Sequence, residues 1–463
     1  MSGPVATVAV FALFALSGLG VLAVLGVARS PGELCRRAGL APLTGIAFTG
    51  IVAATLATAG SRLGISGFVA LTALVCTAGG ARLVRGTAAV PGVGRGRLRR
   101  AELAVVAVAV TTLAVVCASA LAAFRGKPLA EYDGWAIWGM KARAIATIGS
   151  ADPHVFASPA YERLHLEYPL LLPAVNSLPL QAAEGYSSNT VLLSCLGIGL
   201  AGLFAIWALL HDRVRPVVLL PFVVAIAAAP AFFGQLRTGY ADVPLAVLVA
   251  AGLGAGALWL VEGRAAWLGL LTLFFAAAVL TKNEGTLFAA ALYVPLLLVA
   301  QGKRRAVLAS GGVVALAYAP WMLYTRAHDL EAPDYDLSST FDISWVAGRL
   351  DRAPGAAAEL VAQALDPRRL GFLVLLGLFA VVVSLARGSR PLGLLAGGFA
   401  LSSIAGLTWI YVLSPYDLSF YLSTNSDRVV VAPVIGLATL APLLLEECAR
   451  RIAAEEGDVG AQR

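Results

Sequence analysis

The sequence predicts an all-α polytopic membrane protein with about thirteen transmembrane helices and an outer-face loop that contains interfacial helices. Two observations carry this prediction. The first is composition: of 463 residues, 59% are hydrophobic and only 13% are charged, whereas soluble domains have about 25% charged residues. The second is the recurrence of apolar runs of roughly twenty residues, whose backbone groups can be satisfied in lipid only within spanning helices.

The apolar runs recur along the whole chain. They cover residues 5–28, 41–60, 63–80, 101–124, 190–210, 217–234, 243–261, 267–280, 286–300, 306–325, 371–386, 391–414 and 429–445. No Lys or Arg precedes the first run, whereas Arg29, Arg36 and Arg37 follow it. A cleavable signal peptide has the reverse charge order, so we expect a first spanning helix with its N-terminus outside.

Loop charge predicts the orientation. Residues 81–100 are rich in arginine, which assigns them to the cytoplasmic side. Alternation outward from that loop places these basic residues on the same side: Arg213, Arg215, Arg264, Lys303, Arg304, Arg305, Arg387, Arg390, Arg450 and Arg451. The short loops on the other side carry one basic residue each, namely Arg62, Arg237, Lys282 and Arg428. The net charge of +7 therefore reflects orientation in a lipid bilayer and requires no nucleic-acid partner.

Two long polar segments, 125–189 and 326–370, fall on the outer face in this arrangement. We divide the chain into three N-terminal transmembrane helices with a basic loop (1–100), a transmembrane core (101–325) that includes the first segment, the second outer segment (326–370), C-terminal transmembrane helices (371–447) and a frayed cytoplasmic tail (448–463). The sequence has no P-loop, no HExxH motif and no GxGxxG in a dinucleotide-binding context. A mechanism driven by a cytosolic nucleotide is therefore unsupported.

The first outer segment opens with two carboxylates, Glu131 and Asp133. A helical stripe follows, made of Trp135, Trp138, Ala142 and Ile145. Tryptophan prefers the depth of the lipid headgroups, so this stripe is typical of a helix that lies in the membrane interface. Asp133 precedes that helix, either as an N-cap or as a catalytic carboxylate held at the membrane boundary, and the two roles are compatible.

Further along the same segment, Glu167 and Tyr168 precede Pro169. Proline disfavours a helical conformation in the preceding residue, so we expect a turn that directs Glu167 to the same rim. The alternative is a plain helix start, where the dipole favours an acidic residue. His165 lies two residues from Glu167, but spacing alone does not define a metal site.

Three later outer loops also carry ionisable residues. One contains Arg237, Tyr240 and Asp242, and the next contains Lys282 and Glu284. Ionisable residues at a bilayer boundary are costly unless they are paired or functional. They form either local ion pairs, worth little at an exposed site, or part of one substrate site.

The last outer loop, residues 415–428, combines aromatic and hydroxyl side chains with Arg428. Aromatic rings and a guanidinium suit a sugar or a lipid phosphate. The same mixture is also found in an ordinary solvated loop.

These motifs, in this order, resemble the GT-C glycosyltransferases, which are integral membrane enzymes that take a sugar from a polyprenyl-phosphate carrier on the outer face. The group includes protein mannosyltransferases and lipid A aminoarabinose transferases. The motifs that carry the resemblance are Glu131-Tyr-Asp-Gly-Trp, Glu167-Tyr-Pro, Tyr240-Ala-Asp-Val-Pro and Lys282-Asn-Glu-Gly, and they cover roughly residues 101–325. In many members the acidic loop follows the first helix, whereas here three predicted helices come before residue 81.

The resemblance implies an inverting transfer of a sugar from a polyprenyl-phosphate donor to a glycolipid, polysaccharide or protein acceptor. It implies that Asp133 is the base, with Glu131 as the nearby alternative. Asp242 and Glu284 would match pocket acids, which bind a divalent metal in some members. The expected substrate-binding set is Glu167, Tyr168, Arg237, Tyr240, Asp242, Lys282, Glu284 and Arg428.

Other functions remain open at this stage. A transporter or flippase for a lipid-linked or anionic substrate would use the same outer acids and arginines as a gate. A non-catalytic scaffold and a ligase-like enzyme with a diphosphate donor are further alternatives. The Arg-rich, Lys-poor composition favours a bacterial source, and hence a multi-pass protein of the plasma membrane.

Overall fold

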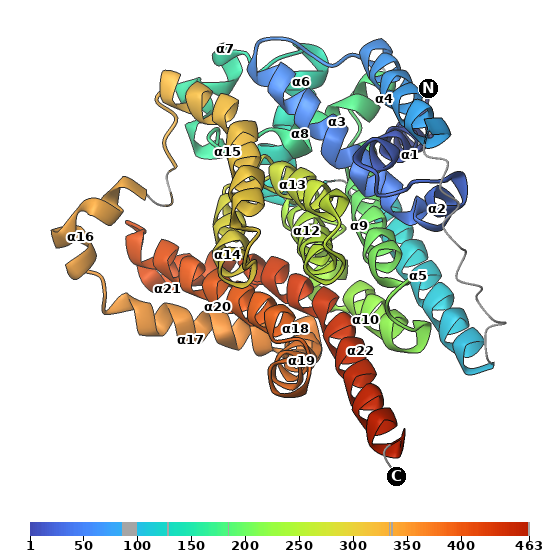
Figure 1. Cartoon of the computed structure of the whole chain (residues 1–463). Coiled ribbons are helices and arrows are strands. Elements are labelled where there is room, and N and C mark those ends of the chain that lie inside the picture. Colours follow the sequence, from blue (N-terminus) through green and yellow to red (C-terminus); the bar gives the residue numbers. More distant parts are fainter. Residues whose placement is uncertain (86–99, 127–128, 184, 333, 335–336, 462–463) are drawn as a thin grey trace.

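The computed structural model describes residues 1–85, 100–126, 129–183, 185–332, 334 and 337–461. Within this part of the chain every regular element is a helix (Figure 1). The predicted all-α class is therefore confirmed. The arginines predicted to mark the cytoplasmic loop at positions 95, 97 and 99 lie outside the described residues.

Each of the thirteen apolar runs coincides with a helix. In chain order they are α1 (Gly3–Leu25), α3 (Ala41–Thr58), α4 (Ile65–Arg85), α5 (Arg100–Gly126), α9 (Ser188–Leu210), α10 (Pro216–Ala228), α12 (Asp242–Glu262), α13 (Ala265–Val279), α14 (Glu284–Val299), α15 (Arg304–Ala327), α19 (Leu373–Arg387), α20 (Arg390–Leu413) and α22 (Val431–Ala461). Among the described residues nine helical stretches are long and apolar enough to cross a membrane. The helices α10, α13, α14 and α19 are shorter. A polytopic membrane protein is thus supported, and the number thirteen stays a prediction.

Helix α12 forms the centre of the bundle. All of its residues from Asp242 to Trp259 are buried, and it packs against α9, α13 and α22. A helix that is apolar around its whole circumference is stable only when other helices surround it. The N-terminal end of α12 is therefore a rigid support for any group placed on it.

Between α5 and α9, the described part of the segment 125–189 contains five helical elements. They are the π-helical turn η2 (Asp133–Gly139), α6 (Met140–Thr147), α7 (Pro153–Phe156), the 3₁₀ turn η3 (Pro159–Leu164) and α8 (Leu171–Ala182). The chain turns at residues 165–168, before Pro169, as expected, and the helix α8 that follows has residues 171–180 all buried. It packs against α6 and α3.

The tryptophan stripe faces protein rather than lipid over most of its length. Trp138, Ala142 and Ile145 are buried, and only Trp135 is largely exposed. One reason is that α6 packs on α8. A second is that the π-helical turn has more than 3.6 residues per turn, which changes the faces that a regular α-helix would predict.

The segment 326–370 also folds into helices, which the sequence interpretation treated as a loop. They are η4 (Leu337–Phe341), α16 (Ile343–Ala347), α17 (Arg352–Leu365) and α18 (Pro367–Leu370). Helix α17 is amphipathic and buries Ala356, Leu360 and Ala364 as it packs against α20 and α21 (Leu418–Val429). Their i, i+4, i+8 spacing is the periodicity of one helical face.

Two short elements, α2 (Pro31–Arg36) and η1 (Ala38–Leu40), connect α1 to α3, and α11 (Pro230–Gln235) follows α10. Pro230 explains the break in the run 217–234, because the residue before it, Ala229, is extended. The tail after residue 448 was expected to be frayed, but α22 continues to Ala461. Good helix formers, including Arg, Ala and Glu, make up most of that stretch.

Helices α14 and α20 pack against each other in opposite directions. One end of this pair, which we call the Asp242 end, holds the start of α14 and the end of α20. The other, the Lys303 end, holds the end of α14, the start of α20 and the end of α12. The structure has a cavity at each of these ends.

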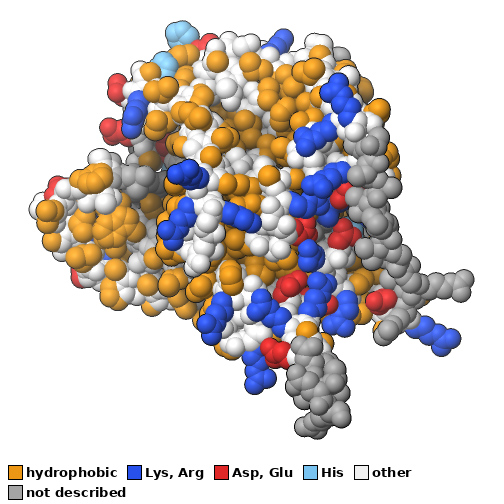
Figure 2. All heavy atoms as spheres, viewed as in Figure 1, with side chains coloured by type: hydrophobic (Ala, Val, Ile, Leu, Met, Phe, Trp, Pro, Cys, Tyr) orange, Lys and Arg blue, Asp and Glu red, His pale blue; other side chains and the backbone are white. Residues whose placement is uncertain are grey.

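Basic loops gather around the Lys303 end. Arg213 pairs with Glu262 at 3.2 Å, and Arg450 and Arg451 donate hydrogen bonds to the backbone of Arg213 and Gly388. Figure 2 shows lysine and arginine side chains gathered mainly in the lower half and on the right of the face turned to the viewer, with fewer carboxylates among them. The basic loops that the sequence assigned to one side are thus linked by direct contacts.

Candidate functional site

A cavity of about 810 Å³ opens at the Asp242 end. Its walls come from η2, the start of α14, the end of α20, and α21. Seven aromatic residues line it: Tyr132, Tyr168, Trp409, Tyr411, Tyr416, Phe420 and Tyr421. Cavities of this size and character, with a few polar groups among apolar walls, are typical of small-molecule sites.

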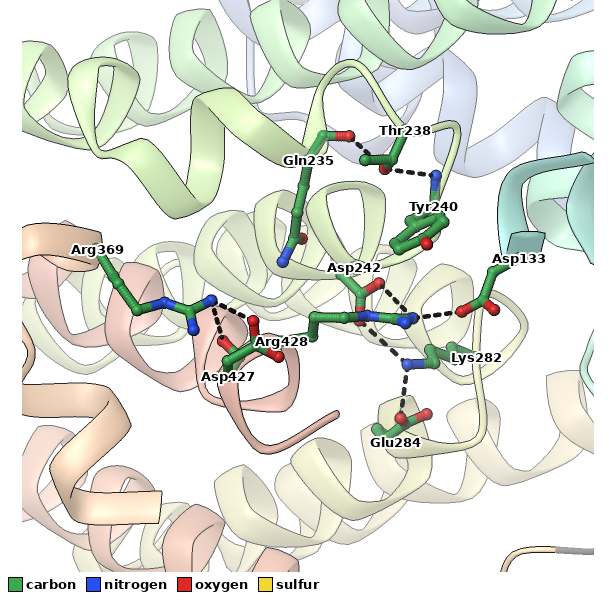
Figure 3. Close-up of polar contacts among 10 residues, drawn as sticks. All are labelled: Asp133, Gln235, Thr238, Tyr240, Asp242, Lys282, Glu284, Arg369, Asp427 and Arg428. Carbon is green, nitrogen blue, oxygen red and sulfur yellow. Dashed lines mark hydrogen bonds and ion pairs between the residues drawn. The ribbon is translucent and has the colours of Figure 1, made fainter. Parts of the chain in front are cut away.

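Five charged side chains form one network beside this cavity (Figure 3). The Arg428 Nη2 atom donates to Asp133 Oδ2 at 2.7 Å and to Asp242 Oδ2 at 3.2 Å. The Lys282 Nζ atom lies 3.1 Å from Asp242 Oδ1 and 2.7 Å from Glu284 Oε1. Asp242 is thus held by both cations, while Asp133 and Glu284 occupy the two ends of the network.

The network is largely removed from solvent. The side chains of Asp242 and Lys282 are only 5% and 6% exposed, whereas those of Asp133 and Arg428 are 23% and 18% exposed. Burial acts to lower the pKa of Lys282, but Asp242 and Glu284 outweigh it and raise that pKa. Lys282 therefore remains a cation at neutral pH.

Arg428 is positioned from two sides. Its guanidinium carbon lies 4.2 Å from the centre of the Tyr240 ring, a cation–π geometry. The preceding residue, Asp427, accepts a 2.5 Å hydrogen bond from Arg369 in α18. Burial, together with the nearby Asp133 carboxylate, raises the pKa of Tyr240 to about 12, so its phenol stays neutral.

Glycines allow the loops that carry these side chains to approach closely. A Cβ atom on Gly134 would lie 2.0 Å from the carbonyl oxygen of Thr238, so η2 can pack on the loop before α12 only with glycine there. The same loop turns at Gly239, whose φ of +74° favours glycine. A Cβ on Gly285 would lie 2.0 Å from the Ala278 carbonyl oxygen, which fixes the start of α14 against the end of α13.

Several buried polar atoms around the network have no hydrogen-bond partner among the described residues. They are Glu284 Oε2, Asn283 Oδ1 and Arg428 Nε. Buried polar groups are nearly always satisfied in folded proteins. All three residues line the cavity, so a polar ligand or water bound there would supply the missing partners.

A second polar cluster adjoins the cavity, and its members His165 and Tyr168 line it. Tyr168 stacks between Trp138 and His165, with ring centres 5.4 Å and 4.9 Å apart. The His165 Nδ1 atom lies 3.1 Å from Glu167 Oε1. Burial lowers and Glu167 raises the pKa of His165, and the net shift is upward.

Lys141 is the most deeply buried cation of this cluster. Its side chain is inaccessible to solvent, and its ammonium donates to the backbone carbonyl oxygens of His165, Leu166 and Tyr168. Burial lowers the pKa of Lys141 to about 7, although Glu167 acts in the opposite direction. Lys141 therefore holds the chain between His165 and Tyr168 in place rather than facing the cavity.

The structure brings together most of the predicted site residues. Asp133, Tyr168, Lys282, Glu284 and Arg428 line the cavity. Asp242 and Tyr240 contact Arg428 directly.

Three of the predicted residues lie elsewhere. Glu131 is exposed and does not line the cavity. Arg237 is exposed and its guanidinium covers Phe233 at 4.7 Å instead of pairing with Asp242. Glu167 is turned towards His165 and lines a neighbouring cavity of about 450 Å³.

The N-cap interpretation of Asp133 does not match the structure. Tyr132 occupies the N-cap position of η2, and no side chain caps it. The Asp133 carboxylate instead accepts from Arg428, 295 residues away in the sequence. Local ion pairing does apply to Lys282 and Glu284, but this pair is buried and continues into the larger network.

Sequence reasoning missed several cavity residues. Tyr411 donates its hydroxyl hydrogen to Asn425 Oδ1, and both residues line the cavity. Asp334, from the second long segment, also lines it. Tyr411 lies inside an apolar run and Asn425 in a loop of mixed composition, so neither had a distinctive signal.

Among the described residues, no group of three or more His, Cys, Asp or Glu side chains converges in a way that could hold a metal ion. The carboxylates of the network are instead occupied by Lys282 and Arg428. The residues present therefore do not form a metal centre by themselves.

Comparisons with known proteins found no matching family model, no matching curated protein and no matching solved structure. The geometry of the site therefore has to carry any functional conclusion.

Proposed function

We propose that this protein is a membrane glycosyltransferase that moves a sugar from a polyprenyl-phosphate-linked donor to an acceptor hydroxyl on the outer face of the membrane. The observation that carries the proposal is the shared position of Asp133, Lys282 and Arg428. A carboxylate and two cations line one aromatic cavity at the end of a bundle of apolar helices. A lipid-linked sugar phosphate has an anionic phosphate for the cations, a sugar ring for the aromatic walls and an apolar chain for the surrounding helices.

The orientation of this cavity follows from loop charge. The basic loops gather at the Lys303 end, which the positive-inside rule assigns to the cytoplasm. The Asp242 end then faces outward. A donor whose lipid tail stays in the bilayer would present its phosphate at the Asp242 end.

The cations would receive the donor phosphate. Arg428 and Lys282 both line the cavity, and Arg428 retains an unpartnered Nε–H group. As the bond between the anomeric carbon and the phosphate oxygen breaks, the electron pair stays on the phosphate and negative charge grows there. Fixed cations at that point stabilise the transition state more than the ground state.

Asp133 would act as the base. Arg428 occupies its Oδ2 atom, and among the described residues no hydrogen bond to its Oδ1 atom is formed. An acceptor hydroxyl bound at Oδ1 would lose its proton to Asp133 while its oxygen bonds to the anomeric carbon. Because attack comes from the side opposite the phosphate, the transfer inverts the anomeric centre.

Arg428 would also couple binding of the donor to the state of Asp133, the proposed base for the acceptor. It holds Asp133 and Asp242 at once, so a donor phosphate that binds Arg428 competes with these carboxylates for its N–H groups. Donor binding would thereby loosen the contact of Arg428 with Asp133. The aromatic wall formed by Tyr416, Tyr421 and Trp409 offers flat apolar faces for the sugar ring or the first isoprene unit.

Transfer from radiolabelled polyprenyl-phosphate sugars into lipid, polysaccharide and protein fractions of a membrane extract tests the proposal. Loss of one general base lowers the rate by about 10²- to 10⁴-fold, so Asp133→Asn is expected to lose transfer by that factor. Glu131→Gln is expected to retain it, because Glu131 lies outside the cavity. Unchanged transfer by folded Asp133→Asn would reject Asp133 as the base.

The alternative is a transporter for an anionic or lipid-linked substrate. One observation favours it, namely the presence of a second cavity at the opposite end of α14 and α20. Uptake of a labelled polyprenyl-phosphate sugar into sealed vesicles without release of the sugar would support transport. Sugar transfer in detergent, where no compartments exist, would support the transferase.

A further inference from the structure

The second cavity, about 720 Å³ in volume, lies at the Lys303 end and is separate from the proposed site. Its walls are the end of α12, the end of α14, and the loop and first turns that join α19 to α20. Leu298, Leu394 and Leu401 line it and are 67%, 53% and 74% exposed, so the cavity is a groove open on its side. In a membrane this apolar opening faces acyl chains.

The rim of the groove carries positive charge that no acidic side chain of its lining neutralises. Lys303 and Arg390 line it, and its lining contains no Asp or Glu. The Lys303 ammonium lies 5.6 Å from the centre of the Trp259 ring. The side chain of Arg390 forms no hydrogen bond or ion pair with another described residue.

Two further features favour an anion at the rim. Helix α20 begins at Arg390, and its N-cap residue Ser389 makes no side-chain cap. Pro391 in its first turn has no N–H, but the N–H groups of the neighbouring first-turn residues still attract negative charge. Ser389 and Gln301 also line the groove and supply neutral hydrogen-bonding groups.

Glycine shapes the groove. On α20, Gly393, Gly397 and Gly398 all line it. A Cβ atom on Gly398 would lie 2.7 Å from Pro295 of α14, and one on Gly393 would lie 2.9 Å from Leu385 of α19. Helices α14, α19 and α20 can therefore pack closely at these glycines, and the groove lies beside the places where they meet.

We infer that this groove binds one anionic phospholipid of the cytoplasmic leaflet, with the phosphate against Lys303 and Arg390 and an acyl chain along Leu298, Leu394 and Leu401. Charge complementarity selects the lipid, because the cytoplasmic leaflet is rich in anionic headgroups and this end carries the basic loops. The inference is independent of the proposed glycosyl transfer. It requires only that the Lys303 end lies at headgroup depth.

Native mass spectrometry of the full chain, loaded with phosphatidylglycerol or phosphatidylcholine, tests this assignment. We expect one tightly retained phosphatidylglycerol and no equally retained phosphatidylcholine. Each basic residue near a membrane surface strengthens the binding of an anionic lipid. The double variant Lys303→Gln with Arg390→Gln is therefore expected to weaken phosphatidylglycerol binding roughly 10- to 30-fold. The matched control is Arg36→Gln with Arg85→Gln, which removes the same charge from exposed positions outside the groove.

A second variant keeps the charge and fills the slot. Leu394→Trp is expected to displace the retained phosphatidylglycerol, whereas Leu316→Trp, on the exposed face of α15 and outside the groove, is expected to leave it bound. Thermal unfolding of each variant establishes that it is folded. Equal retention of both lipids, or phosphatidylglycerol binding that neither the double Gln variant nor Leu394→Trp weakens, would overturn the inference.

Discussion

The two ends of α14 handle charge in opposite ways. At the Asp242 end, Lys282 and Arg428 are buried or nearly so, and each contacts two carboxylates. At the Lys303 end, Lys303 and Arg390 are exposed and the groove that they line has no carboxylate. The two regions lie about 24 Å apart along the axis of this 16-residue helix, at 1.5 Å per residue.

This difference indicates what each region is suited to do. Buried ions must be paired with accurate geometry, because an unpaired buried charge is very unfavourable. Such a network holds its members in fixed positions, as transition-state stabilisation requires. Exposed, unpaired cations impose no such geometry, and they are suited to attracting a mobile anionic headgroup.

The largest expected effect comes from removing the cation that joins Asp133 to Asp242. Arg428→Met leaves two carboxylates without their shared partner, and breaking a buried pair costs about 3 kcal/mol or more. We expect a loss of that size in the free energy of unfolding, measured by denaturant titration in detergent. Arg390→Met is the matched control from the other end, and it should change this free energy by less than about 0.5 kcal/mol.

A similar loss in the two variants would contradict the contrast between a paired and an unpaired end. It would show that Arg428 contributes no more to the fold than an exposed arginine.

The next largest effect is on sugar transfer. Removing one group that stabilises transition-state charge costs about 10²- to 10³-fold in rate, so we expect Lys282→Gln to slow transfer from a polyprenyl-phosphate sugar by that factor. Arg237→Gln should change the rate less than about two-fold, because Arg237 covers Phe233 outside the cavity. If Arg237→Gln were the more harmful change, the placement of the donor phosphate would be wrong.

Glycine substitutions probe the backbone that supports the network. Gly285→Ala places a Cβ atom 2.0 Å from the Ala278 carbonyl oxygen, and such overpacking costs about 1–3 kcal/mol. We expect a lower midpoint of thermal unfolding together with slower transfer. Gly312→Ala, in α15 with no atom within 4 Å of the new Cβ, should be neutral or stabilising by up to about 1 kcal/mol.

The smallest effect is a dependence of stability on pH. The pKa of His165 is raised above its usual 6.5 in the folded chain, with Glu167, Asp334 and Lys141 facing it. The pairing therefore stabilises the fold fully below pH 6.5 and ceases to do so as pH rises through the raised pKa.

His165 is also held in the left-handed region, with φ of 49°. Asparagine tolerates this conformation without titrating, so His165→Asn isolates the charge. We expect the unfolding midpoint of the wild type to fall between pH 6 and pH 8 by more than that of the variant. An identical pH profile for the two proteins would exclude His165 as the source.

The sequence was most informative about the membrane helices. Every long apolar run coincides with a helix, because burial and lipid exposure both demand apolar side chains over that length. The amphipathic helix α17 was missed, since Pro354 and Gly355 near its start are typical of a loop and its apolar face is made mainly of alanine. The break at Pro230 has a local cause in the proline, whereas the buried helix α8 depended on packing partners that a single sequence does not reveal.

The site was predictable only in outline. Acidic and basic residues at the ends of helices identified most of its members, because such residues are costly at a bilayer boundary. Their pairing was not predictable. Asp242 contacts Arg428, 186 residues away, rather than the nearby Arg237. The pairing of Asp242 with Arg428 depends on the position of α21 and on the stacking of Arg428 over Tyr240, both of which are tertiary features.

The central claim is that one cavity holds the donor phosphate against Lys282 and Arg428 beside Asp133. The most direct test is an experimental structure of the protein with a bound polyprenyl-phosphate sugar. We predict phosphate oxygens about 3 Å from the Arg428 guanidinium or the Lys282 ammonium, with the anomeric carbon on the side of Asp133. A phosphate bound outside this cavity, with the contact between Arg428 and Asp133 unchanged, would contradict the account.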